Sequence, residues 1–143
     1  MEQHPERSIK LAEEYLAAAK LALGDQLSNP AISLAIHSAI QAKDALYLKV
    51  KKEIVKPRSH GQAVKHVRSL GVLGEASLNQ LSRLLASKSE AEYGQLELPL
   101  LDAVESIRDA ERFLETVKAL LATKLTCTQP LHCGSIVRFQ SAR

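Results

Sequence analysis

Apolar residues recur every three or four positions along five stretches of the chain, the spacing that places them on one face of an α-helix. Proline, glycine and helix-capping residues separate these stretches. The predicted helices span about 5–23, 30–50, 59–70, 75–93 and 100–124. No segment alternates apolar and polar residues long enough to predict a strand. The sequence therefore predicts an all-α fold, an antiparallel bundle of four long helices plus a short helix.

Capping and breaking residues set the expected boundaries of the second and third helices. Asn29 is a typical capping residue, and Pro30 follows at the first helical position, where a missing N–H costs least. Pro57 should break the second helix. Ser59 is expected to cap the short helix together with Gln62, three residues later.

The apolar face of each long helix is expected to be buried. The apolar face of the second helix consists of Ile32, Ala35, Ala39, Ala42, Leu46 and Val50, and the small residues among them indicate a close approach to a neighbouring helix. On the fourth helix, Lys88 continues a stripe of leucines, and Gly94 is the expected stop. The last helix is expected to bury Leu101, Val104, Ile107, Leu114, Val117 and Leu121.

The periodic pattern stops near residue 125. We therefore assign 1–125 to one helical domain and 126–143 to an irregular or disordered tail, whose deletion should leave the thermal midpoint nearly unchanged. Both cysteines, Cys127 and Cys133, lie in this tail, which agrees with a reducing compartment. No apolar run reaches the length of a membrane span, and the N-terminus lacks a signal-peptide pattern. The sequence predicts a soluble cytoplasmic protein.

Charge is distributed unevenly, although the net charge is only +3. Residues 43–68 contain eight Lys or Arg and two Asp or Glu, whereas residues 90–115 contain two Lys or Arg and eight Asp or Glu. Such basic and acidic regions can guide a polyanion to one side of the molecule, or they can complement each other within a fold or dimer. They can also be ordinary solvated helix faces, and the sequence leaves these interpretations open.

Three stretches carry a resemblance to a known family. Their sequences are AIHSAIQAKDAL at 35–46, RSH at 58–60 and LLASKSEAEYG at 84–94. In order and spacing they resemble the HEPN superfamily, over about residues 5–124. The resemblance implies an antiparallel helical bundle with an additional short helix, which often forms a homodimer. It also implies a role in toxin–antitoxin, defence or RNA-processing systems, with a nucleotidyltransferase-like or antitoxin protein as a possible partner.

Many HEPN members are metal-independent ribonucleases that use an Arg, four to six intervening residues and a His. This sequence departs from that motif, because Arg58 and His60 are separated by one residue and no other Arg precedes a His at the required spacing. In members whose motif ends in His-x-Tyr, Tyr93 would match the tyrosine, Ala91 the histidine and Ala86 the arginine. Neither alanine ionises, so the resemblance points to a subgroup without the usual acid–base pair, and we predict weak or absent ribonuclease activity.

Five residues are candidates for ligand binding. Lys88, on an apolar stripe, either binds a phosphate with help from Tyr93 or forms an internal ion pair with Asp44. Arg58 and His60 stand at the start of the short helix, where N–H groups and the helix dipole favour an anion, unless the capping residues already satisfy those donors. Arg58, His60, Lys88 and Tyr93 are expected to converge in one pocket or dimer cleft.

No catalytic residue, cofactor or metal site is assigned. The lone His37, next to the second apolar face, is interpreted as a hydrogen-bonded, partly buried side chain. Cys127, His132 and Cys133 lack the paired spacing of a zinc site. The sequence thus favours a module that binds RNA, a nucleotide or a partner protein; a divergent ribonuclease and a structural oligomerisation domain are the alternatives.

Overall fold

The computed structural model describes residues 3–53 and 56–123, and this part of the chain contains helices and no strand. The six helices are α1 (Pro5–Gly24), α2 (Ser28–Lys51), α3 (His60–Arg68), α4 (Glu75–Ala86), α5 (Lys88–Tyr93) and α6 (Leu100–Ala122). The predicted all-α class is confirmed. The predicted set of four long helices is not, because only α1, α2 and α6 among the described helices have 20 or more residues. The predicted tail, with Cys127 and Cys133, lies outside the described residues. No helix in the described ranges is long and apolar enough to cross a membrane.

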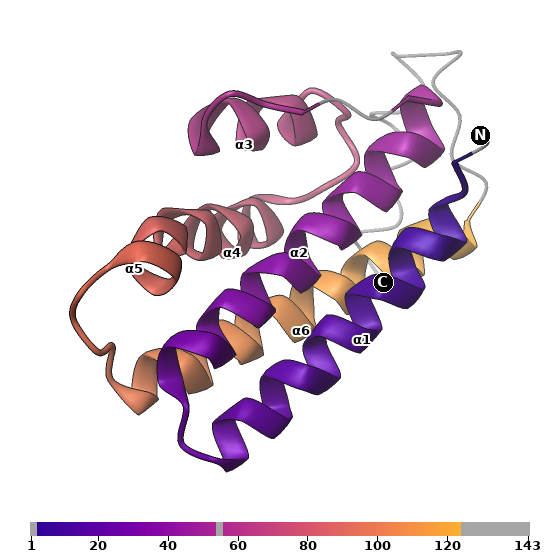
Figure 1. The fold of residues 1–143 in the computed structure, drawn as a ribbon. Helices are drawn as coiled ribbons and strands as arrows, with labels where there is room; N and C mark the ends of the chain where they lie inside the picture. Colours follow the sequence, from indigo (N-terminus) through magenta and orange to yellow (C-terminus); the bar gives the residue numbers. More distant parts are fainter. Residues whose placement is uncertain (1–2, 54–55, 124–143) are drawn as a thin grey trace.

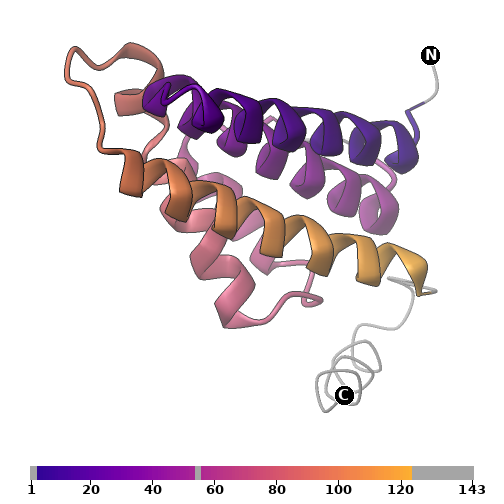
Figure 2. The same ribbon diagram turned by 90° about the horizontal axis from the view of Figure 1, so that it is seen from below.

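Three long helices, α1, α2 and α6, lie side by side, and α1 runs in the opposite direction to the other two (Figure 1). The same three helices lie along one another in the view from below (Figure 2). The shorter helices are added to this layer: α4 packs on α6 and α2, α5 packs on α2, and α3 packs on α4. Because α2 contacts α1, α4, α5 and α6, its side chains reach most parts of the interior.

Burial follows the predicted apolar face on α2 but not on α6. The predicted face of α2 is buried along its whole length, and its alanines allow close helix packing. On α6, Leu101 was expected in the core, yet it is 65% exposed. Phe113, outside the predicted face, is fully buried instead. The expectation for Leu101 is wrong because this residue lies in the first turn of α6, at the edge of the helix layer.

The prediction of one continuous helix over residues 75–93 is wrong. The chain forms two helices there, α4 and α5, that meet at Ser87. The Ser87 hydroxyl donates to the carbonyl oxygen of Arg83 at 3.3 Å, and the Ser87 N–H donates to that of Leu84 at 3.1 Å. A serine that bonds the carbonyl four residues earlier bends a helix. This local bonding ends α4 after 12 residues, so α5 takes its own direction towards α2.

Two of the predicted caps have different outcomes. The Ser59 cap of α3 is confirmed, because its hydroxyl accepts from the Gln62 N–H at 3.1 Å. The Gln62 side chain reaches back as predicted, but it accepts from the N–H of Arg58 at 2.6 Å, one residue before the cap. Asn29 is not a cap, because α2 begins at Ser28. Its amide accepts from the N–H of Leu98 at 2.8 Å and so holds the α5–α6 loop against the start of α2.

Gly94 ends α5 at a position where the backbone leaves no room for a side chain. A Cβ there would lie 2.5 Å from the carbonyl oxygen of Glu90. Gly94→Ala should therefore lower the free energy of unfolding by about 1–3 kcal/mol, measured by urea denaturation, because the turn must shift. Gly24→Ala is the control, since a Cβ at Gly24 meets nothing within 4 Å. Equal stability of the two variants would contradict the proposed close approach.

Candidate functional site

A cavity of about 410 Å³ lies between α2, the start of α3 and the α4–α5 junction. All five residues selected from the sequence line it: Asp44, Arg58, His60, Lys88 and Tyr93. They come from α2, from the segment that enters α3, from α3 and from α5. The structure therefore brings together, within one chain, residues that the sequence places up to 49 positions apart.

The path of the chain after α2 explains this convergence. Residues 56–59 carry the start of α3 to the level of Asp44, about two turns before α2 ends at Lys51. On α2 the lining residues are Ile40, Lys43 and Asp44, so the cavity lies beside the C-terminal half of this helix and not at its last turn. Lys88 and Tyr93 are at opposite ends of the short α5, and both reach the cavity. Tyr93 is 80% exposed and forms part of the rim.

The predicted ion pair between Lys88 and Asp44 is wrong. Asp44 pairs with the neighbouring Lys43, whose side chain is only 7% exposed, and Lys88 pairs with Glu92 on the same helix. The spacing of four residues favours this second pair, since such side chains lie next to each other on a helix. Neither Lys43 nor Glu92 was selected from the sequence. A signal for Lys43 existed, because it stands four residues after Ala39 on the buried face.

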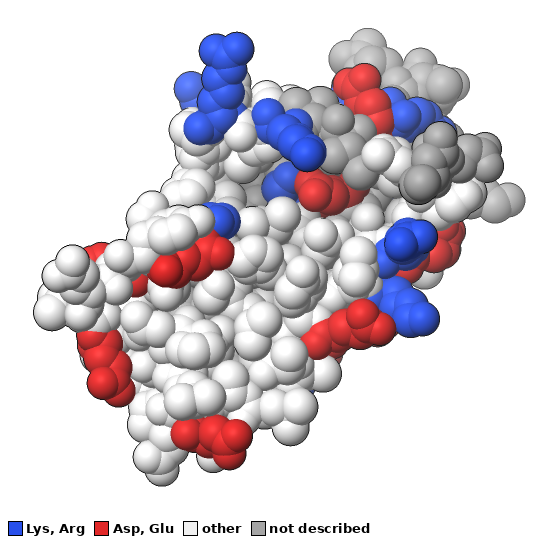
Figure 3. Space-filling view, in the orientation of Figure 1, with Lys and Arg blue, Asp and Glu red and all other residues white. Residues whose placement is uncertain are grey.

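Cationic side chains dominate the wall of this cavity. Lys56, Arg58 and Lys88 line it together with the imidazole of His60 and the Lys43–Asp44 pair, and Asp44 is its only carboxylate among the described residues. Figure 3 shows Lys and Arg gathered over α3 and the upper end of α2, whereas the lower part of this face carries separate Asp and Glu side chains on a largely uncharged surface. The lining therefore favours an anion. Because the α3 capping box already uses the Gln62 N–H, the attraction comes mainly from side chains.

Apolar side chains complete the cavity. Ile40, Ala63 and Leu85 contribute an apolar surface, and Tyr93 adds an exposed aromatic ring. A volume of a few hundred cubic ångströms with a few converging polar groups is typical of small-molecule sites. The arrangement can hold an anionic group among the cations and a planar apolar group against the aromatic ring.

His37 lies outside this cavity and has the environment predicted for it. Its side chain is about one-third exposed, and its Nδ1 lies 2.8 Å from the carbonyl oxygen of Ser33. The prediction of a hydrogen-bonded, partly buried histidine is confirmed.

An acidic cavity lies on another part of the molecule, between α4 and α6. Its lining includes Asp102, Glu105 and Asp109 of α6, whose spacing of three and four residues places them on one helix face. Asp109 accepts two hydrogen bonds from Arg83, at 2.9 and 2.8 Å, and these bonds raise the pKa of the guanidinium. Over residues 3–53 and 56–123, no group of three or more His, Cys, Asp or Glu side chains is arranged to hold a metal ion.

No protein-family model matches this chain, and no curated protein matches it. The chemistry of the cationic cavity is therefore the basis for a functional assignment.

Proposed function

We propose that this chain is a HEPN-like helical module that binds RNA or a nucleotide through a phosphate group in the cationic cavity. The observation that carries the proposal is the meeting of Arg58 and His60, at the start of α3, with Lys88 of α5 around one cavity of about 410 Å³. A cation cluster built from distant segments is harder to explain as an ordinary charged helix face than a run of lysines on one helix.

Each group has a suitable chemistry for this ligand. The Arg58 guanidinium can donate two parallel hydrogen bonds to a phosphate, and the Lys88 ammonium adds a point charge. Tyr93 offers an exposed ring on which a base can stack, an interaction worth about 1–3 kcal/mol in proteins that bind single strands. Phosphate contacts provide affinity with little sequence preference, so we expect binding to depend on salt more than on base sequence.

The family resemblance supplies the biological part of the proposal. A HEPN-like module of this kind acts as a homodimer in a toxin–antitoxin or defence system, next to a nucleotidyltransferase-like or antitoxin partner. The supporting observations are the all-helical fold and the quoted stretches 35–46, 58–60 and 84–94, which contribute Asp44, Arg58, His60, Lys88 and Tyr93 to the cavity.

Fluorescence anisotropy with a labelled 12-nucleotide RNA tests the proposal. Arg58→Ala and Lys88→Ala should each weaken binding about tenfold at low salt, because each removes a charge-assisted contact. Each should also reduce the slope of log K against log salt by about one. Lys20→Ala is the matched control, since Lys20 is a half-exposed lysine on α1 that pairs with Glu111 at 3.1 Å, outside the cavity lining.

Other outcomes separate the alternatives. Competition by a mononucleotide but not by inorganic phosphate indicates that the base contributes. RNA cleavage that persists in EDTA and disappears in His60→Ala would favour the divergent ribonuclease. No binding by the wild type, or equal losses in Lys20→Ala and Arg58→Ala, would refute the proposed site.

A further inference from the structure

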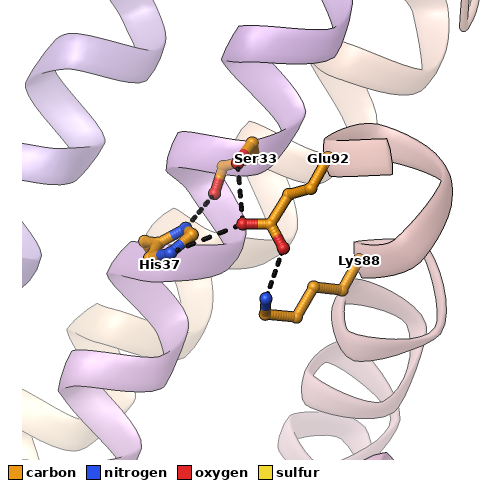
Figure 4. A network of polar contacts seen from close by, with 4 residues as sticks. All are labelled: Ser33, His37, Lys88 and Glu92. Carbon is orange, nitrogen blue, oxygen red and sulfur yellow. Dashed lines mark hydrogen bonds and ion pairs between the residues drawn. The ribbon is translucent and has the colours of Figure 1, made fainter. Parts of the chain in front are cut away.

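A polar network joins α5 to α2 beside the cationic cavity (Figure 4). The Glu92 carboxylate, 15% exposed, pairs with Lys88 through one oxygen. Its other oxygen accepts from the Ser33 hydroxyl at 3.4 Å and lies 3.6 Å from Nε2 of His37. Since Lys88 also lines the cavity, one carboxylate connects a cavity lysine with a titratable ring.

The orientation of the imidazole determines which nitrogen can gain a proton. Nδ1 of His37 faces the carbonyl oxygen of Ser33, which only accepts hydrogen bonds, so Nδ1 carries the hydrogen. In the neutral ring, Nε2 then directs a lone pair towards Glu92. Protonation places an N–H there instead, and the contact becomes an attractive ion pair. On the opposite side, Tyr15 of α1 packs on the ring, with centroids 5.4 Å apart.

Glu92 faces two cations when His37 is protonated. The carboxylate then has a second partner, and the positive ring adds a repulsive interaction with the Lys88 ammonium. Both effects weaken the attachment of Lys88 to Glu92. A lysine released in this way can turn to an anion in the cavity, since its four-carbon stem is flexible.

We infer that Glu92 is a positioning residue that competes with an anionic ligand for Lys88, and that protonation of His37 relieves this competition. The inference rests on the proposed phosphate-binding function. It makes ligand binding and the protonation of His37 reciprocally linked, because a ligand that takes Lys88 leaves Glu92 free for the ring. Affinity should therefore rise as the pH falls through the titration of His37.

RNA binding between pH 8 and pH 5.5 provides the first test. An oligonucleotide without a terminal phosphate is used, so that the ligand charge stays constant. Glu92→Gln should bind about three- to tenfold more tightly than wild type at pH 8, because the competing carboxylate is removed. His37→Gln should lose part of the rise in affinity at low pH. His60 in the cavity wall is present in both proteins, so the difference between them reports on His37.

Two variants control for unspecific charge effects. Glu90→Gln removes an exposed carboxylate from the same helix, and His66→Gln removes a histidine of α3 that contacts Tyr47 rather than the network. Both should retain the wild-type pH profile. The inference fails if Glu92→Gln binds no more tightly than Glu90→Gln, or if His37→Gln keeps the full pH dependence.

A second test needs no ligand. NMR follows the ring titration of His37, assigned through His37→Gln. The midpoint should move to higher pH in Lys88→Met, which removes the competing cation, and to lower pH in Glu92→Gln. If neither variant moves the midpoint, the coupling is refuted whether or not RNA binds. If RNA does not bind but the His37 midpoint moves in these variants, the proposed function fails, and with it the competition between Glu92 and a ligand for Lys88. The electrostatic coupling of His37 to Glu92 and Lys88 would still hold.

Discussion

Asp44→Asn should lower the free energy of unfolding by about 1–3 kcal/mol, the usual cost of leaving a largely buried polar group without its partner, since the Asp44 side chain itself is 20% exposed. Lys43 is nearly enclosed, and its ammonium pairs with the Asp44 carboxylate. An amide of the same shape keeps the packing but removes the compensating charge. The lysine must then remain buried without its counter-ion or rearrange the helix that supports the cavity. Urea unfolding at pH 7, followed by circular dichroism, measures the effect.

Two further variants show whether the loss of stability in Asp44→Asn comes from the burial of Lys43 or would follow from the loss of any ion pair. Glu13 pairs with Lys118 at 2.6 Å, and both side chains are 48% exposed, so Glu13→Gln should cost less than about 1 kcal/mol. The double variant Lys43→Met/Asp44→Leu should recover most of the stability, because an apolar pair needs no charge compensation. If Asp44→Asn is as stable as Glu13→Gln, the buried pair does not support the fold.

Phe113→Ala should also cost about 3–5 kcal/mol, since it removes a fully buried aromatic side chain from α6. This helix packs against α1, α2 and α4, so the resulting cavity lies in the centre of the core. Rigid neighbouring helices can collapse into such a space only in part. The same urea assay should show an earlier midpoint.

Leu101→Ala is the contrasting substitution on the same helix. Leu101 is mostly exposed, so its truncation should change stability by less than about 0.5 kcal/mol. Phe113→Leu should lie between wild type and Phe113→Ala, because it fills part of the space. A Leu101→Ala variant that is as unstable as Phe113→Ala would show that the first turn of α6 is covered in solution, for example by a second copy of the chain.

Local signals in the sequence predicted several local features of the fold, but not all of them. The apolar spacing identified the helical class and the buried face of α2, and Ser59 with Gln62 identified the start of α3. These features depend on residues at most a few turns apart, so helical geometry alone is enough to infer them. The divided helix was missed because Ser87 acts through a hydroxyl bond to the preceding turn, which serine forms only in some contexts.

The candidate site could be selected in part from the sequence. Residue type and position relative to the helices selected Asp44, Arg58, His60, Lys88 and Tyr93, and the structure gathers them around one cavity. The Lys88–Glu92 pair has the four-residue spacing that a helix brings together, so this pairing could have been inferred. The contact of Glu92 with His37 could not, because it depends on how α5 packs on α2.

The sequence by itself determined that the described chain is helical and where most helices begin and end, because these properties follow from local spacing and capping. Only the tertiary structure decided that Lys43 rather than Lys88 pairs with Asp44, that Glu92 joins Lys88 to His37, and that Phe113 is buried while Leu101 is exposed. Those outcomes depend on the rotation and position of each helix relative to its neighbours. That arrangement minimises the free energy of the whole core, so no single segment encodes it.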